Sequence, residues 1–327
     1  MDVASLQAFV AVAEQGSFSL AAEALFLTQP AVSKRVAVLE GELDTRLFDR
    51  IGRTVQLTEA GRLLLPRARH ILAELEDSRR AIASLSDEVA GVLALATSHH
   101  IGLHHLPPVL RSFTAEHGAV ELDLRFMDSE AACRAVEQGE LELAVVTLPP
   151  QASARLETLP LWPDPLHLAA AVGHPLAGRS VLTLEDLATW PAILPAASTF
   201  TRQIAEQAFA PLGLQLKTGL SSNYLETIRM LVSVGLGWSI LPATLLDDQV
   251  IALPLPGGLQ LQRTLGVVRH RDRSQSNAAR AFMEHLLRHA GTKPESPQRR
   301  KARKEIQDKT INNNVLMLYF ASFAPLR

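Results

Sequence analysis

Residues 17–50 read SFSLAAEALFLTQPAVSKRVAVLEGELDTRLFDR, and this stretch decides the fold of the N-terminal part of the chain. Apolar residues recur in it at three- and four-residue spacing, which predicts short amphipathic helices. Ser19 is the expected N-cap of one helix and Thr28 that of the next, with Pro30 in its first turn. A preceding helix is expected to end at Gly16, which tolerates a left-handed C-cap. The pattern therefore predicts three short helices, the last two forming a helix–turn–helix.

The predicted third helix carries a polar face. Its apolar side contains Val32, Val36 and Leu39, and a bidentate amide, a hydroxyl and two cations lie on or beside the opposite side. In a major groove, a glutamine can read adenine, and lysine or arginine can read guanine or phosphate. We therefore expect DNA contacts from Gln29, Pro30, Ser33, Lys34 and Arg35.

A basic hairpin is predicted directly after this helix. Two short strands, LFDR and TVQL, flank the glycine turn at Gly52, and Arg50 and Arg53 lie at that turn. Such arginines can grip phosphates or enter a minor groove, as the wing of a winged helix does. A helical domain with a solvated basic face explains any one of these residues. The ordered combination of helices and basic hairpin favours sequence-specific binding to double-stranded DNA.

Composition bounds the rest of the chain. Its 327 residues predict two or three domains, and its single cysteine excludes an internal disulfide framework. The net charge of −2 argues against bulk attraction to DNA, but residues 30–69 hold 8 basic against 5 acidic residues, a net of +3. No apolar run reaches 18 residues, and the N-terminal stretch is a poor signal peptide. We expect a cytoplasmic protein with no membrane partner.

Residues 9–65 resemble the N-terminal domain of LysR-type transcriptional regulators, a bacterial family. The resemblance implies a winged helix–turn–helix over residues 1–58, with base or phosphate contacts at the helix positions named above and wing contacts at Arg50 and Arg53. Asp44 departs from the pattern, because the family usually has glycine there. The family motif is met at Ser17-Phe18, Ala21-Ala22, Gln29 to Ser33, Leu39-Glu40, Leu47 to Arg50, Leu57-Thr58 and Ala60-Gly61.

A long helix is predicted over residues 59–89. Its apolar residues recur every 3.5 residues, the period of a coiled-coil seam, although Pro66 should bend the helix. A single amphipathic helix packed on its own domain is the alternative. We favour a homodimer or homotetramer, as the resemblance also implies. The expected seam consists of Leu64, Ala68, Ile71, Leu75, Ser78, Ile82 and Leu85.

Residues 91–290 alternate short strands with helical patterns, which predicts parallel sheets with crossover helices in two α/β lobes. Residues 90–161 and 267–290 are expected to form lobe I, and residues 162–266 lobe II. The segment resembles the periplasmic-binding-protein-like effector domain of the LysR-type family. Residues 291–327 form a basic tail that is expected to be disordered.

Three polar segments follow predicted strands and open predicted helices, where small anions bind in such folds. Plain N-capping explains each hydroxyl alone, but their joint position favours a small-molecule effector between the lobes, and would suit a small anion such as a carboxylate. The resemblance implies the same place. The candidate effector residues are Thr97, Ser98, His99, Ser198, Thr199, Thr201, Arg202 and Asn223.

Other interpretations stay open. His99, His100, His104 and His105 could bind a metal in a metal-dependent enzyme, but no acidic or cysteine ligand lies in the motif, so cleft-lining or helix-capping histidines are favoured. Cys133 could be a redox sensor, although a lone cysteine on an apolar helix usually packs as a small hydrophobe. A cytosolic solute-binding protein with an accessory N-terminal domain is the other rival. We expect a regulator that is not an enzyme, has no cofactor, and could contact RNA polymerase.

Overall fold

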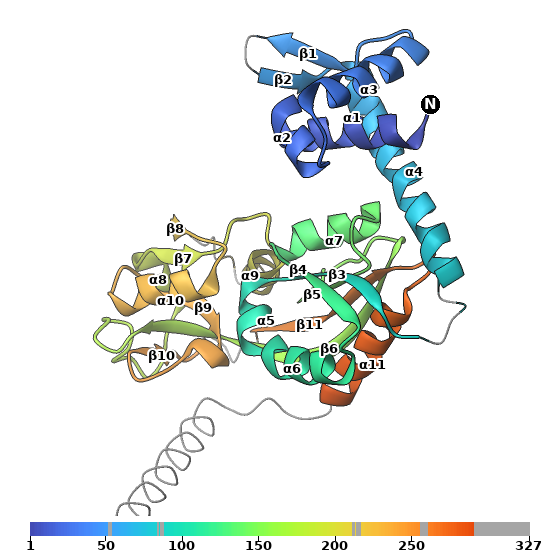
Figure 1. Ribbon diagram of the computed structural model, residues 1–327. Helices are drawn as coiled ribbons and strands as arrows, with labels where there is room; N and C mark the ends of the chain where they lie inside the picture. The colour runs from blue at the N-terminus through green and yellow to red at the C-terminus, as the bar shows by residue number, and fades with distance from the viewer. Residues whose placement is uncertain are drawn as a thin grey trace, which may run out of the picture.

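The structure, a computed structural model, describes residues 1–290 except 52–53, 84, 86–87, 211–212, 214–216 and 256–260. A small N-terminal head is joined by one long helix, α4, to a larger α/β part (Figure 1). Arg53 and the tail 291–327 lie outside the described residues. Among the described helices, none is both long and apolar enough to cross a membrane.

The head consists of three helices and a two-stranded hairpin. Three aromatic rings fill its centre, with the Phe9 and Phe18 rings 5.4 and 5.8 Å from that of Phe48. Burial of such rings is the main driving force for a domain of this size. The arrangement confirms the expected winged helix–turn–helix. Its elements are α1 (Val3–Gln15), α2 (Phe18–Ala24), α3 (Gln29–Glu42), β1 (Phe48–Ile51) and β2 (Thr54–Leu57).

The helix ends of the head follow local rules with one correction. Gly16 has φ +60° and closes α1, as expected. The N-cap of α2 is Ser17, whose hydroxyl accepts from the Leu20 N–H, so the assignment of that cap to Ser19 was wrong. Asp44 has φ +46°, the left-handed conformation that glycine takes most easily, and aspartate tolerates it.

The α/β part is built on a seven-stranded sheet of order β10-β6-β11-β5-β3-β4, with β9 also paired to β6. Strands β3, β4 and β5 are parallel, as expected, but β6, β9, β10 and β11 pair antiparallel. The sheet is therefore mixed. Its strands are β3 (Gly91–Thr97), β4 (Val120–Phe126), β5 (Leu143–Thr147), β6 (Leu156–Ala171), β9 (Ser239–Pro242), β10 (Val250–Ala252) and β11 (Leu261–His270).

Helices cover this sheet and form the second lobe around a small parallel pair, β7 (Ala192–Leu194) and β8 (Thr218–Ser221). The lobe I core contains Phe113 and Phe282, and the lobe II core contains Phe209 and Trp238. The helices are α5 (His99–His104), α6 (Leu106–Glu116), α7 (Ser129–Gln138), α8 (Leu184–Thr189), α9 (Phe200–Phe209), α10 (Leu225–Ser233) and α11 (Asn277–Ala290), with a short 3₁₀ turn at Ala243–Leu245.

The two lobes are joined by the long strands β6 and β11. The sequence suggests a break between the lobes near Leu161-Trp162-Pro163, and these residues lie within β6. In this half of β6 the structure shows pairing with β11 alone, while β9 and β10 pair with the later residues 166–171. An edge strand tolerates proline because one row of its N–H groups needs no partner. The strand therefore continues through both lobes.

Candidate nucleic-acid interface and ligand cleft

The reading surface of the head lies along α3. Val32, Val36 and Leu39 are fully buried against the head core, which turns the polar side of the helix outward. Gln29, Pro30 and Lys34 are exposed, and Ser33 and Arg35 are half-buried. The Gln29 Nε2 donates to the Ser33 Oγ at 2.9 Å, which holds the amide along the helix surface. The structure thus leaves three of the five helix residues named from the sequence exposed, with Ser33 and Arg35 partly exposed.

The wing is fixed to the reading helix by Glu40. Its Oε1 accepts from the backbone N–H groups of Leu47 and Phe48, at 2.7 and 3.3 Å. Sequence reasoning did not assign Glu40 a role, and only the fold brings its carboxylate to the start of β1. Arg50 lies in β1 opposite Val55. The expected wing contact of Arg53 lies outside the described residues.

Helix α4 (Glu59–Ala83) ends before the predicted residue 89, so it contains the residues of the expected seam from Leu64 to Ile82, and Leu85 lies beyond its end. Ala68 is fully buried and Leu64 is half-buried, and both pack in the core of their own head. Ile71 and Ile82 are 40% and 70% exposed. The first part of the seam is therefore used within the chain, and its later part presents apolar side chains outward.

A cavity of about 50 Å³ lies between the lobes. Five of the eight residues named from the sequence line it, and they come from both lobes. By the volume that one water needs, the cavity has room for a few waters or a small polar group. Its lining consists of Ser98, His99, His100, Asp128, Ser129, Glu130, Thr147, Pro195, Thr199, Thr201, Asn223, Tyr224, Leu225 and Arg263.

Arg263 supplies the cation of this cavity. Its side chain is 4% exposed, its Nε lies 2.8 Å from an Asp164 carboxylate oxygen, and its Nη1 donates to the Thr201 hydroxyl at 3.0 Å. Its Nη2 finds no hydrogen-bond acceptor among the described residues. A buried N–H without an acceptor costs free energy that a ligand oxygen can recover. The guanidinium is thus arranged to receive an anion.

Three of the named effector residues lie elsewhere. The Thr97 hydroxyl is buried and donates to the Val145 carbonyl at 2.9 Å. Ser198 lines a neighbouring cavity of about 400 Å³. Arg202 binds Glu206 at 2.6 Å and Thr218 at 2.7 Å, and it is absent from the cavity lining. The cation facing the cavity is Arg263, which sequence reasoning missed. Its one signal was a charged residue inside the apolar strand LQRTLGVV.

The cleft is closed by contacts between the lobes. The Asn223 amide donates to Asp128 at 2.7 Å and accepts from the Ala196 N–H at 3.1 Å. The Glu130 carboxylate accepts from the Phe200 N–H at the start of α9. Burial raises the pKa of Glu130, although that hydrogen bond opposes the effect. Ligand entry must therefore compete with polar contacts already made across the cleft.

Two residues of the histidine run act as packed rings. His99 contacts Tyr224 edge-on, with ring centres 4.4 Å apart, and so joins the lobes. His105 lies 5.1 Å from Trp162, and burial lowers its pKa from the ordinary 6.5 to about 4. His99 has the expected cleft-lining position, whereas the side chain of His105 packs on Trp162 and makes no capping hydrogen bond to α6. His100 and His104 make different contacts, described below.

Cys133 on α7 is buried, and burial raises the pKa of its thiol to about 12. Reactive sensor cysteines instead have lowered pKa values, because the thiolate is the nucleophile. The packed, protonated thiol favours the structural role.

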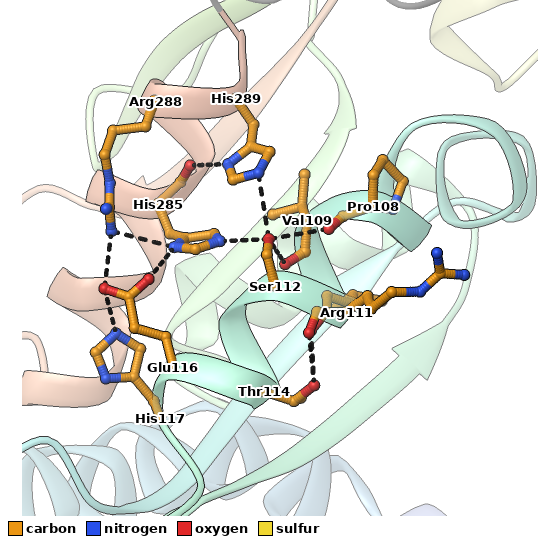
Figure 2. Close-up of polar contacts among 11 residues, drawn as sticks. Pro108, Val109, Arg111, Ser112, Thr114, Glu116, His117, His285, Arg288 and His289 are labelled. Atoms are coloured by element: carbon orange, nitrogen blue, oxygen red, sulfur yellow. Dashed lines mark hydrogen bonds and ion pairs between the residues drawn. The ribbon is translucent and has the colours of Figure 1, made fainter.

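A second polar cluster joins α6 to α11 on lobe I (Figure 2). The Ser112 Oγ lies 2.7 Å from the His285 Nε2 and 3.2 Å from the His289 Nε2, and the His285 Nδ1 lies 3.4 Å from Glu116. The order serine, histidine and carboxylate resembles a hydrolytic triad. However, Ser112 also donates to the Pro108 carbonyl of its own helix at 2.9 Å. This hydroxyl therefore serves the packing of α11 on α6.

Comparisons with known proteins agree with this organisation. Residues 3–62 match the model of the bacterial regulatory helix-turn-helix proteins of the lysR family, and residues 86–291 match the LysR substrate binding domain. A probable RuBisCO transcriptional regulator of Trichormus variabilis is 31% identical over 291 residues, covering 86% of each chain. A regulator of unknown role from Azotobacter vinelandii is 69% identical over 108 residues, covering 33% of this chain and 75% of that protein.

Solved structures show the same fold. Full-length OxyR of Pseudomonas aeruginosa matches with a TM-score of 0.65 at 23% identity, covering 88% of this chain and 98% of that one. CbnR in complex with its target DNA matches with a TM-score of 0.60 at 23% identity, covering 88% and 99%. With both domain models matched in order, the chain belongs to the LysR family of bacterial transcriptional regulators.

Proposed function

We propose that this regulator reads its operator through Gln29, Pro30, Ser33, Lys34 and Arg35 of α3, with Arg50 and Arg53 of the wing, and that a small anion in the interlobe cavity controls it. One observation carries the second half of the proposal. The buried Arg263 lines a cavity shared by both lobes, and its Nη2 has no hydrogen-bond acceptor among the described residues. A ligand that binds one lobe arrangement better than the other shifts the equilibrium between them.

The proposed DNA contacts are tested by measuring the affinity for DNA and the preference for particular bases separately. A duplex selected from random sequence by the wild-type protein, and a scrambled duplex, are titrated at several salt concentrations. Lys34→Ala should weaken both complexes and lower the salt slope by about 0.9, because one phosphate contact is lost. Gln29→Ala should cost about 1–3 kcal/mol on the selected duplex alone, through lost base discrimination. Unchanged affinity in both variants would contradict the assignment of α3 as the reading helix.

The ligand part is tested with a panel of small carboxylates and inorganic phosphate in a thermal-shift assay. An anion that raises the wild-type melting temperature should lose its effect in Arg263→Gln and keep it in Arg202→Gln. Both arginines are buried and paired with a carboxylate, but only Arg263 lines the cavity. Ser98→Ala is a milder probe, because the Ser98 hydroxyl makes no capping bond to α5. An equal shift in all four proteins would place the ligand elsewhere.

A solved structure similar to the α/β part of this chain holds a small molecule. The effector binding domain of QuiR in complex with shikimate matches with a TM-score of 0.56 at 23% identity, covering 62% of this chain and 99% of that one. We infer that the interlobe cavity of this protein is the corresponding effector site. The sequence-derived residues Ser98, His99, Thr199, Thr201 and Asn223 would then contact the ligand beside Arg263, with Thr97, Ser198 and Arg202 supporting the walls.

We propose that the later part of the α4 seam forms the homodimer, or one interface of a homotetramer. Ile71, Leu75 and Ile82 of α4, with Leu85 just beyond its end, would pair with a second chain, because a partly exposed apolar stripe at 3.5-residue spacing needs a partner. Ile82→Glu should lower the oligomer mass in sedimentation. Glu74→Lys, an exposed charge change beside the seam, should not. An unchanged mass in Ile82→Glu would contradict the seam.

The remaining assignments follow from the regulator role. We propose that the protein acts in the cytoplasm, where its operator lies, that it contacts RNA polymerase when it activates, and that it catalyses no reaction. Incubation with a generic ester such as p-nitrophenyl acetate tests the last point at the Ser112 cluster. Hydrolysis that disappears in Ser112→Ala would overturn it.

A further inference from the structure

Two histidines of lobe I meet a carboxylate of lobe II beside the interlobe cavity. His100 and His104 lie one turn apart on α5, and Glu226 lies in the first turn of α10. The Glu226 Oε1 is 3.2 Å from the His100 Nδ1 and 3.1 Å from the His104 Nε2. The three ligand atoms all lie within 4.8 Å of one another. The acidic ligand that the sequence motif lacks is thus supplied from residue 226, across the cleft.

We propose that His100, His104 and Glu226 form a binding site for a divalent transition-metal ion of the zinc type that joins the two lobes. Two imidazoles and one carboxylate are a common ligand set for Zn²⁺, with the fourth position left to water or an incoming ligand. Ligands about 2.0–2.2 Å from a tetrahedral ion lie roughly 3.3–3.6 Å from one another. The two nitrogen–oxygen distances are already close to that spacing.

The surroundings of the ligands suit a metal. The His100 Nε2 lies 3.2 Å from the Thr244 hydroxyl, so a metal on Nδ1 leaves the ring proton on Nε2, where Thr244 accepts it. Such outer hydrogen bonds orient metal-binding histidines. The side chain of His100 is 3% exposed, while those of His104 and Glu226 are 25% and 31% exposed, so the site is anchored and still open to entry.

Electrostatics favour the ligand forms of these groups. Burial lowers the pKa of His100, which keeps its imidazole neutral, as a metal ligand must be. Burial alone would raise the pKa of Glu226, but the hydrogen bonds from His100 and His104 outweigh it and hold the pKa below its usual range. The nearby Arg263 is neutralised by its own partner, Asp164. The site therefore has two neutral imidazole ligands and one negatively charged ligand, the Glu226 carboxylate.

The metal ion would hold the two lobes together, because its ligands come from both. His100 and His104 follow β3 in lobe I, whereas α10 packs in a core of lobe II that includes Leu225 and Ile228. Coordination by both sides favours the closed cleft over the open one, since any ligand stabilises the state that binds it better. The metal and the organic effector would then act on the same lobe movement from adjacent sites.

The test uses the full-length protein without a histidine tag, stripped with a chelator and titrated with Zn²⁺ by calorimetry. We expect saturation at one ion per chain and a rise in melting temperature. His104→Ala and Glu226→Gln should each weaken binding by more than about tenfold, and Thr244→Val by about tenfold. Co²⁺ should give the visible absorption of a four-coordinate nitrogen–oxygen site in the wild type and lose it in His104→Ala.

Two controls locate the ion. His70→Ala removes an exposed histidine of α4, and His289→Ala removes one of the α6–α11 cluster, so both should bind Zn²⁺ as the wild type does. Circular dichroism checks that each variant is folded. No binding by the wild-type protein, or binding that persists in both His104→Ala and Glu226→Gln, overturns the proposal. Neither DNA nor the organic effector is present, so the result is independent of the proposed regulatory function.

Discussion

In the head, the helix side chains expected to meet DNA all come from residues 29–35 of α3, and each is at least partly exposed. In the cleft, the lining side chains come from segments between residues 98 and 263, and several are buried. The DNA-reading surface is a local property of one helix. The ligand cleft is a property of how two lobes close on each other.

The two regions also treat charge differently. Lys34 of the reading surface is exposed and solvated, so its charge costs little to keep. Arg263 of the cleft is buried and needs Asp164, Thr201 and a further acceptor. A solvated cation suits long-range attraction to phosphate, whereas a buried one suits selection of a single small ligand.

Removing the Arg263 side chain should give the largest effect. Arg263→Met leaves the Asp164 carboxylate buried without its partner, which should cost about 3–5 kcal/mol in the free energy of unfolding. Urea denaturation measures the loss. Arg269→Met is the matched control on the same strand, because its pair with Glu157 is partly solvent-exposed, 31% and 46%, and worth at most about 1 kcal/mol. Equal losses in the two variants would contradict the difference between buried and exposed charge.

The pH dependence of stability should sharpen the comparison next. The pKa of His105 is about 4 in the folded protein and 6.5 when unfolded, so between these values only the unfolded state takes up the proton. Stability is therefore lost as the pH falls from 6.5 toward 4, by up to about 3 kcal/mol from this residue. His105→Phe should remove this part of the pH-dependent loss of stability, measured by urea denaturation at pH 7, 5.5 and 4.5. A variant that follows the wild-type pH curve would show that His105 is not the group responsible.

A close backbone contact in the head should give a smaller loss. A Cβ added at Gly61 would collide with the Leu47 carbonyl oxygen, so Gly61→Ala should destabilise by about 1–3 kcal/mol. Gly41 lies in α3 with open space around it, and Gly41→Ala should stabilise by up to about 1 kcal/mol. Thermal unfolding compares the two. The same sign of effect in both would contradict the packing at the start of α4.

The smallest effect concerns a helix cap. Ser17→Ala removes the hydroxyl that accepts from the Leu20 N–H and should cost about 0.5–1 kcal/mol, at the low end for caps because the bond is 3.4 Å long. Ser19→Ala, inside the helix, should cost nothing or stabilise slightly. The pair is measured by thermal unfolding. A larger loss in Ser19→Ala would restore the cap that the sequence pattern favours.

The sequence pattern predicted secondary structure correctly where short-range interactions determine it. The three head helices, the hairpin, and the parallel strands β3, β4 and β5 follow from periodicity and turn residues. The break between lobes that the sequence suggests near Leu161-Trp162-Pro163 falls inside β6, a continuous strand that passes from the lobe I core to the lobe II core. There β6 pairs with β11 alone. Periodicity reports which face of an element is buried. It does not report which edge of a strand lacks a partner, because strand order is set by distant segments.

The residues of the site also fall into those that the sequence pattern identified and those that only the structure identified. The hydroxyls of Thr199 and Thr201 were found because helix starts have a sequence signal, and both line the cavity. Arg202 is the cation that the sequence predicts for the effector site, because it follows the same hydroxyls, but the arginine that lines the cavity is Arg263. Glu226 could not be paired with the histidine motif, because 122 residues separate it from His104.

By itself the sequence determined a winged head that reads DNA, an apolar seam on the connecting helix and two α/β lobes, because each depends on short-range periodicity and capping. Only the tertiary structure decided which arginine lines the cavity, and which carboxylate meets His100 and His104. Those choices depend on how strands from opposite ends of the domain pair and how the lobes close. A buried charge takes its partners from whatever the fold brings within about 3 Å, at any separation along the chain.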